Sequence, residues 1–178
     1  MKRTAAVIAA LMLGPMVLLA QKTSFDYDKT ANFGAYKTYA LVDGKKVGDP
    51  LIDKRIVAAI EAELAAKGLT PAATSPDVLV TYHVAFDKKQ DITAYSTGMG
   101  GMGMGYRWGG GWGTTDVRVN EILVGTMVID IADATKKEMV WRGMGVREVD
   151  VQAKAEKRDK NINNAVKKIL KDFPPKAS

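Results

Sequence analysis

Residues 117–151, VRVNEILVGTMVIDIADATKKEMVWRGMGVREVDV, decide the fold of this chain. Apolar residues recur at alternate positions over 117–131 and again over 139–151, which is the period of a β-strand with one buried face. Between the two runs, residues 133–137 have the polar composition of a turn. The stretch therefore predicts two long antiparallel strands joined as a hairpin, one face of which must be covered by the rest of the chain.

Three shorter strands are expected before this hairpin. Phe25 and Tyr27 alternate with polar residues, and residues 37–42 alternate again. Residues 77–86 form the clearest run, with valines and aromatic rings on one side of the strand. Leu79, Thr81, His83 and Ala85 point to the other side.

Two amphipathic helices are expected. The first has Asp49 as its cap, Pro50 at its first position and an apolar stripe up to Leu64, and Gly68 follows as a left-handed terminator. The second spans about 154–173, where apolar residues recur at helical spacing until Pro174 and Pro175 end it.

The order strand, strand, helix, strand, hairpin, helix predicts an α+β fold. We expect an antiparallel sheet of about four to five strands with both helices packed on one face, because each helix has a single apolar stripe. The other face, which includes Thr81 and His83, is then solvated or available to a partner.

The N-terminus has the pattern of a secretory signal peptide. Lys2 and Arg3 precede an apolar run over residues 5–19, and Ala20 is a small residue at the expected cleavage point. We therefore expect residues 1–20 to be removed, residues 21–178 to fold as a single domain, and the protein to be periplasmic or secreted. The residues before the cut resemble those of a bacterial lipoprotein, but position 21 is Gln, so no lipid anchor is expected.

Composition narrows the classes of function. The net charge is +6, of which Lys2 and Arg3 supply two, and the remaining +4 is spread along the chain, so nucleic-acid binding is not indicated. The chain has no Cys, which excludes disulfides, thiol nucleophiles and thiolate metal sites. Stability must therefore come from a packed core.

Several blocks resemble one known family when they are read in order. They are FDYD at 25–28, NFGAYKTYA at 32–40, PDVLVTYH at 76–83, GTMVIDIAD at 125–133, MVWRGMG at 139–145 and NAVKKILKDFP at 164–174. This ordered set is similar to the Domain of Unknown Function 4136 family of bacterial envelope proteins, many of which are lipoproteins. The resemblance implies a fold and an envelope location, and it supplies no reaction and no catalytic residues.

The segment 98–113 has the most unusual composition, because nine of its sixteen residues are Gly. One interpretation is a plain connector between two strands. A second is a partner-binding loop, since exposed aromatic side chains suit a protein groove, a glycan or the membrane interface. The residues for this role are Tyr106, Arg107, Trp108 and Trp112.

A third interpretation of the segment is a soft-metal site. The thioethers of Met99, Met102 and Met104 are closely spaced ligands of the kind that selects Cu(I). His83 could add a nitrogen only if its face of the strand lies under this segment, and a satisfied hydrogen bond is its simpler role. The glycine spacing also matches a dinucleotide fingerprint, but no helix pattern follows it, so no cofactor is expected.

Enzymatic residues are scarce in this sequence. No serine has the context of a catalytic nucleophile. A hydrolase with paired carboxylates from the hairpin is an alternative, and its candidates are Glu121, Asp130, Asp133 and Glu138. Trp141 and Arg142 are expected to pack on the core and to pair at the surface, respectively. The sequence thus favours a non-catalytic binding or structural module that acts through the segment 98–113, not an enzyme.

Overall fold

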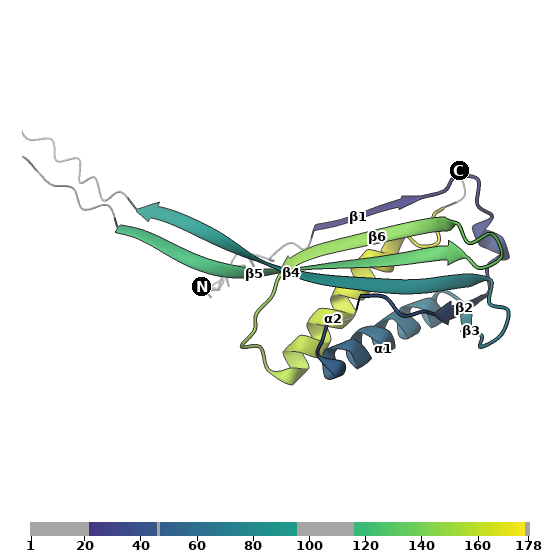
Figure 1. The fold of residues 1–178 in the computed structure, drawn as a ribbon, viewed down its shortest axis with the longest axis horizontal. Helices are drawn as coiled ribbons and strands as arrows, with labels where there is room; N and C mark the ends of the chain where they lie inside the picture. Colours follow the sequence, from purple (N-terminus) through teal and green to yellow (C-terminus); the bar gives the residue numbers. More distant parts are fainter. Residues whose placement is uncertain (1–21, 46, 96–115, 177–178) are drawn as a thin grey trace, which may run out of the picture.

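The computed structural model describes residues 22–45, 47–95 and 116–176 (Figure 1). In chain order the elements are β1 (Lys22–Tyr27), a 3-10 turn (Phe33–Ala35), β2 (Thr38–Leu41), α1 (Pro50–Ala66), β3 (Thr70–Pro71), β4 (Val78–Tyr95), β5 (Asp116–Asp133), β6 (Met139–Glu148), α2 (Ala155–Ile169) and a second 3-10 turn (Leu170–Asp172). The predicted α+β class and the hairpin of β5 and β6 are confirmed.

The strands form one six-stranded sheet in the order β1-β6-β5-β4-β2-β3. The prediction of four to five antiparallel strands was wrong, because β2 runs parallel to both β3 and β4. α1 connects β2 to β3, and a helical crossover of this kind returns the chain to the same end of the sheet, so that the next strand runs parallel. β3 has only two residues, too few to show alternation in the sequence.

The ends of α1 follow the predicted local chemistry. The Asp49 carboxylate accepts hydrogen bonds from the amides of Leu51 and Ile52, with Pro50 at the first helical position. Gly68 has a φ of +85° and follows the C-cap residue, where a side chain would be strained. The sequence-based bounds of this helix are therefore confirmed.

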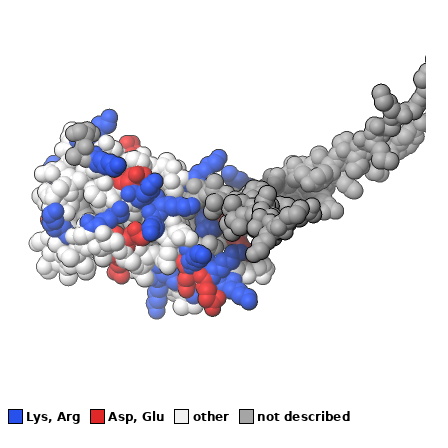
Figure 2. Space-filling view, turned by 180° about the vertical axis from the view of Figure 1, so that it is seen from behind, with Lys and Arg blue, Asp and Glu red and all other residues white. Residues whose placement is uncertain are grey.

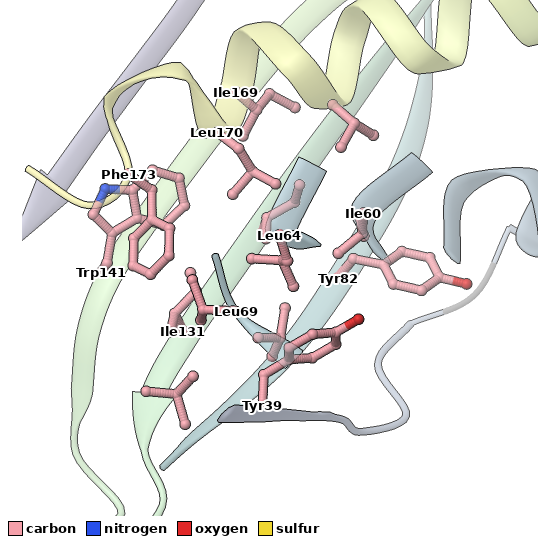
Figure 3. Close-up of a cluster of buried hydrophobic side chains, with 14 of the residues drawn as sticks. Tyr39, Ile60, Leu64, Leu69, Tyr82, Ile131, Trp141, Ile169, Leu170 and Phe173 are labelled. Atoms are coloured by element: carbon pink, nitrogen blue, oxygen red, sulfur yellow. The ribbon is translucent and has the colours of Figure 1, made fainter. Parts of the chain in front are cut away.

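Both helices cover the same face of the sheet. α1 buries Ile56, Ile60 and Leu64, and α2 with the turn after it buries Val166, Ile169 and Leu170. The side chains that meet them come from alternate strand positions and include Val78, Val80, Ile129, Ile131 and Trp141. Figure 3 shows this core, with Trp141 beside Phe173 at one end and Tyr39 and Tyr82 at the other.

β4 and β5 are much longer than the other strands. They pair from Val78 with Asp133 out to Tyr95 with Asp116, whereas β6 pairs with β5 only as far as Val124. Beyond residues 87 and 124 the two strands continue alone as a projecting arm (Figure 1). With eight residues of β4 beyond Asp87, the arm is roughly 26 Å long at about 3.3 Å per residue.

Asp77 fastens the start of β4 to β2. Its carboxylate accepts hydrogen bonds from the amides of Lys37 and Thr38, both at 2.8 Å, and from the Thr38 hydroxyl at 2.9 Å. These bonds favour the ionised carboxylate and hold the pKa of Asp77 below its ordinary value of 3.8. The bond from the Lys37 amide makes the largest contribution.

This lowered pKa gives a testable dependence on pH. Because the folded-state pKa is below the unfolded one, the stabilisation by Asp77 is fully present above about pH 4 and is lost as the pH falls through the folded value. We expect Asp77→Asn to show a shallower loss of stability between pH 4 and pH 2 in urea unfolding. Asp172→Asn, at an exposed carboxylate, is the control. Equal slopes for Asp77→Asn and the wild type would contradict this assignment.

Candidate functional site

An apolar pocket lies between the helices and the sheet, at the base of the arm. Its volume is about 360 Å³. Its inner walls are aliphatic or aromatic and are formed by Ile52 and Ile56 of α1, Val84 and Phe86 of β4, Leu123 and Met127 of β5, and Ile162 and Ala165 of α2. We call it the arm-base pocket. Its volume and its apolar walls are typical of sites that bind small molecules.

Two glycines lie in the strands that line this pocket. Gly125 and Gly145 lie in strand interiors and line the pocket without side chains. A Cβ on Gly125 would lie 2.9 Å from the Val149 side chain and 3.4 Å from that of Phe86. Glycine weakens a strand, so its presence inside one is typical of a close approach by another group.

The polar residues of the pocket come mainly from the end of β6 and the first turns of α2. Arg147 donates from Nη1 to the Asn161 carbonyl at 3.2 Å and from Nε to the Glu148 carbonyl at 3.3 Å. Arg158 donates from Nε to the Ala153 carbonyl at 2.8 Å. Both guanidinium groups are thus positioned by backbone carbonyls, and neither pairs with a carboxylate of residues 22–45, 47–95 or 116–176.

Two carboxylates also line this pocket. Asp49 is occupied as the cap of α1, where its oxygen accepts two backbone amides. Glu148 is exposed to solvent. The two arginines therefore keep hydrogen-bond donors and charge for a group that enters the pocket.

A second polar group lies on the sheet face that the helices leave uncovered. Asp130 is buried there, and Arg142 holds it with two hydrogen bonds, Nε to Oδ1 at 2.6 Å and Nη2 to Oδ2 at 2.8 Å. This pairing raises the pKa of Arg142. His83 lies beside the pair, with its Nε2 3.8 Å from Oδ2 of Asp130, while its Nδ1 accepts the Lys45 amide at 3.0 Å. The expected satisfied hydrogen bond of His83 is confirmed, as are the packing of Trp141 and the pairing of Arg142.

The structure does not bring the four hairpin carboxylates together. Glu121 lies on the arm, where it pairs with Lys88. It is nine residues along β5 from Asp130, a separation of roughly 30 Å. Asp133 accepts hydrogen bonds from the Thr135 and Lys136 amides in the turn that ends at Glu138. Glu121 is therefore far from Asp130, whereas Asp133 and Glu138 lie opposite each other, with the Asp133 amide donating to the Glu138 carbonyl at 2.9 Å.

A second hollow, of about 590 Å³, lies between α1 and the segment after β2. Tyr82 lines it and donates its hydroxyl hydrogen to Asp53 at 3.0 Å. Burial, with this hydrogen bond next, raises the pKa of Tyr82 to about 12, so the phenol stays protonated at neutral pH. Asp53 also accepts the Val47 amide, and both polar groups are therefore satisfied within the fold.

The sequence-predicted partner and metal residues lie outside the described residues. They are Tyr106, Arg107, Trp108 and Trp112 for a partner and Met99, Met102 and Met104 for a metal, all between Tyr95 and Asp116 in the chain. Within the described residues no group of three His, Asp or Glu side chains could hold a metal ion. Sequence reasoning missed the arm-base pocket, and the only local signal for it was the pair of glycines inside β5 and β6.

On the face drawn in Figure 2, Lys and Arg side chains are interspersed with Asp and Glu side chains. No helix among the described residues has the length and apolar character needed to cross a membrane.

Two solved structures share this fold. A PDZ domain protein from Parabacteroides distasonis aligns over 88% of this chain with a TM-score of 0.56 and 19% identity, and the chain spans 35% of that protein's length. A PelC dodecamer from Paraburkholderia phytofirmans aligns over 85% of this chain and 95% of its own, with a TM-score of 0.51 and 11% identity. At these identities the likeness concerns the fold alone.

Comparison with the curated proteins gave no match. The profile of a protein family described as a domain of unknown function, DUF4136, matches residues 23–175. The match includes all the described strands and helices except the first residue of β1. It agrees with the resemblance of the ordered sequence blocks to this family. The chain belongs to the DUF4136 family.

Proposed function

We propose that this protein is a non-catalytic binding module of the cell envelope, and that it holds a small apolar ligand in the arm-base pocket. The observation that carries the proposal is the pocket itself, about 360 Å³ of apolar space inside a folded domain. Ligand pockets of roughly 300–1,000 Å³ are usually apolar inside with a few placed polar groups. Apolar side chains remain exposed at its mouth, where Val151 is 60% and Phe86 is 44% exposed.

The envelope location rests on the N-terminal pattern. Lys2, Arg3 and the apolar run before Ala20 support export to the periplasm or the medium, with cleavage after Ala20. N-terminal sequencing of the protein from fractionated cells tests this part of the proposal. A mature chain beginning at Gln21 supports it, and an intact N-terminus in the cytoplasmic fraction contradicts it.

The arm supports a second, separate contact. The chain between Tyr95 and Asp116 connects the two strands of the arm, so we propose that its aromatic residues dock on an envelope protein or a glycan. A photo-crosslinker at Trp112 in living cells tests this, with a site on α1 as control. The metal alternative predicts instead that Cu(I) binding is lost when Met99, Met102 and Met104 become Leu.

Binding of a neutral apolar dye tests the pocket directly. We expect N-phenyl-1-naphthylamine to fluoresce on binding to the wild type. Its affinity for the variant Ile162→Trp should be at least tenfold lower, because the indole fills the space that the dye needs. Ile162 is half-buried in the wall of the pocket, and Met144, on the uncovered face of the sheet, gives the matched control Met144→Trp.

Circular dichroism should first show that both variants are folded. Equal dye affinity in the wild type and Ile162→Trp would mean that the dye binds elsewhere, and the proposed function would then be wrong. No dye binding by the wild type would also count against it.

A further inference from the structure

We infer that the ligand of the arm-base pocket is a single acyl chain that ends in an anionic head group, with the chain between the helices and the sheet and the head at Arg147 and Arg158. This inference rests on the proposed function, since it names the class of ligand for the same pocket.

The interior selects an aliphatic ligand. Most side chains on its walls, such as Ile52, Val84 and Leu123, offer no hydrogen bonds, and Thr126 and Asn161 are polar exceptions. At Gly125 and Gly145 the backbone belongs to the strands β5 and β6, which are paired with their neighbours. A polar group buried against the aliphatic walls would therefore lose its hydrogen bonds to water without replacement. An acyl chain has no such group.

The size and lining of the pocket suit a thin apolar ligand. A volume of about 360 Å³ with mostly apolar walls fits a single chain. An extended peptide would bring backbone amides and carbonyls that apolar walls leave unsatisfied. A flexible hydrocarbon chain has no such groups.

The two arginines select the charge of the head group. The Nε atoms of Arg147 and Arg158 are held by the carbonyls of Glu148 and Ala153, which fixes the guanidinium groups without neutralising them. Both groups keep free N–H donors, and a guanidinium binds carboxylate or phosphate oxygens with two parallel hydrogen bonds. They lie at the mouth of an apolar pocket, so one molecule can satisfy both features only if it is amphiphilic and anionic.

Calorimetric titration with three matched amphiphiles below their micelle concentrations tests the inference. Dodecanoate, dodecanol and dodecylammonium share one chain and differ in the head group. We expect the wild type to bind dodecanoate on the order of tenfold more tightly than dodecanol, because only the carboxylate makes charge-assisted hydrogen bonds with the two arginines. Dodecylammonium should bind the least, because its charge is repelled by the arginines. Acetate, the head group without the chain, should not bind.

Substitutions at the mouth locate the head group. Arg147→Gln and Arg158→Gln should each weaken dodecanoate on the order of tenfold and leave dodecanol unchanged. Lys168→Gln, at another exposed cation of α2, is the matched control and should change neither.

The outcomes separate this inference from the proposed function. The inference of an anionic head group is overturned if dodecanoate and dodecanol bind equally well, or if neither arginine substitution weakens dodecanoate. The proposed function is still supported in that case if Ile162→Trp weakens dye binding. Failure of every amphiphile to bind, together with dye binding that Ile162→Trp abolishes, would overturn the acyl chain alone. If the wild type binds neither the dye nor any of the amphiphiles, both proposals are overturned.

Discussion

Replacement of Trp141 by alanine should lower the free energy of unfolding by about 3–5 kcal/mol, the usual cost of removing a large buried aromatic side chain. Trp141 is 1% exposed, and its ring packs edge-on against Phe173, with 5.4 Å between the ring centroids. Gly143 leaves the space that the indole fills, since a Cβ there would lie well inside contact distance of the indole edge. Trp141→Ala would therefore leave a cavity among close-packed neighbours, which relax only in part.

Chemical denaturation followed by far-UV circular dichroism measures this effect, because other tryptophans would complicate fluorescence. Trp141→Phe should cost clearly less than alanine, since it keeps a ring against Phe173 and removes an indole N–H that has no hydrogen-bond partner within the described residues. Met139→Ala, at a 48% exposed position two residues away, is the control and should change stability by less than about 1 kcal/mol. A loss of under 1 kcal/mol for Trp141→Ala would show that the ring is not part of the core.

Replacement of Arg142 by leucine should lower the free energy of unfolding by about 2–3 kcal/mol. The substitution leaves the Asp130 carboxylate, 6% exposed, without the two hydrogen bonds that now satisfy it. Removing one partner of a fully buried pair costs about 3–5 kcal/mol, and the smaller figure applies here because the Arg142 side chain is 52% exposed. Urea unfolding at neutral pH measures the loss.

Two further variants separate a buried charge from a lost surface ion pair. The double variant Asp130→Leu with Arg142→Leu should recover most of the stability, because no uncompensated charge remains. Arg55→Leu breaks a pair with Asp159 in which both side chains are partly exposed, and it should cost less than about 1 kcal/mol. If Arg142→Leu and Arg55→Leu lower the free energy of unfolding by the same amount, the buried Asp130 carboxylate does not need Arg142. The explanation by an uncompensated buried charge is then wrong.

The residues on the uncovered face also bear on the enzyme question. Asp130 was a candidate for hydrolysis in the sequence, and in the structure its two oxygens are held by Arg142 instead of facing a second carboxylate. Asp133 is engaged by the amides of a turn and by the Tyr36 hydroxyl. These bonds give both carboxylates a structural role.

Local patterns predicted the helices and most strands well. The Asp49 cap, Pro50 and Gly68 bound α1 because capping depends only on adjacent residues. Alternation predicted which residues of β4 face the helices. It underestimated the length of β4, because the polar residues from Asp87 onward lack the apolar alternation of a strand packed on a core. The strand was expected over 77–86 and extends to Tyr95.

The sequence by itself determined the α+β class, the family, the ends of α1 and the buried face of β4, since each of these follows from residue periodicity or from chemistry within a few positions. Only the tertiary structure decided that β2 lies parallel to β4, that Asp130 is held by Arg142, and that Ile52, Phe86 and Ile162 enclose one pocket. These features join residues from 12 to more than 100 positions apart. They depend on how separate elements pack together, and no local pattern specifies that packing.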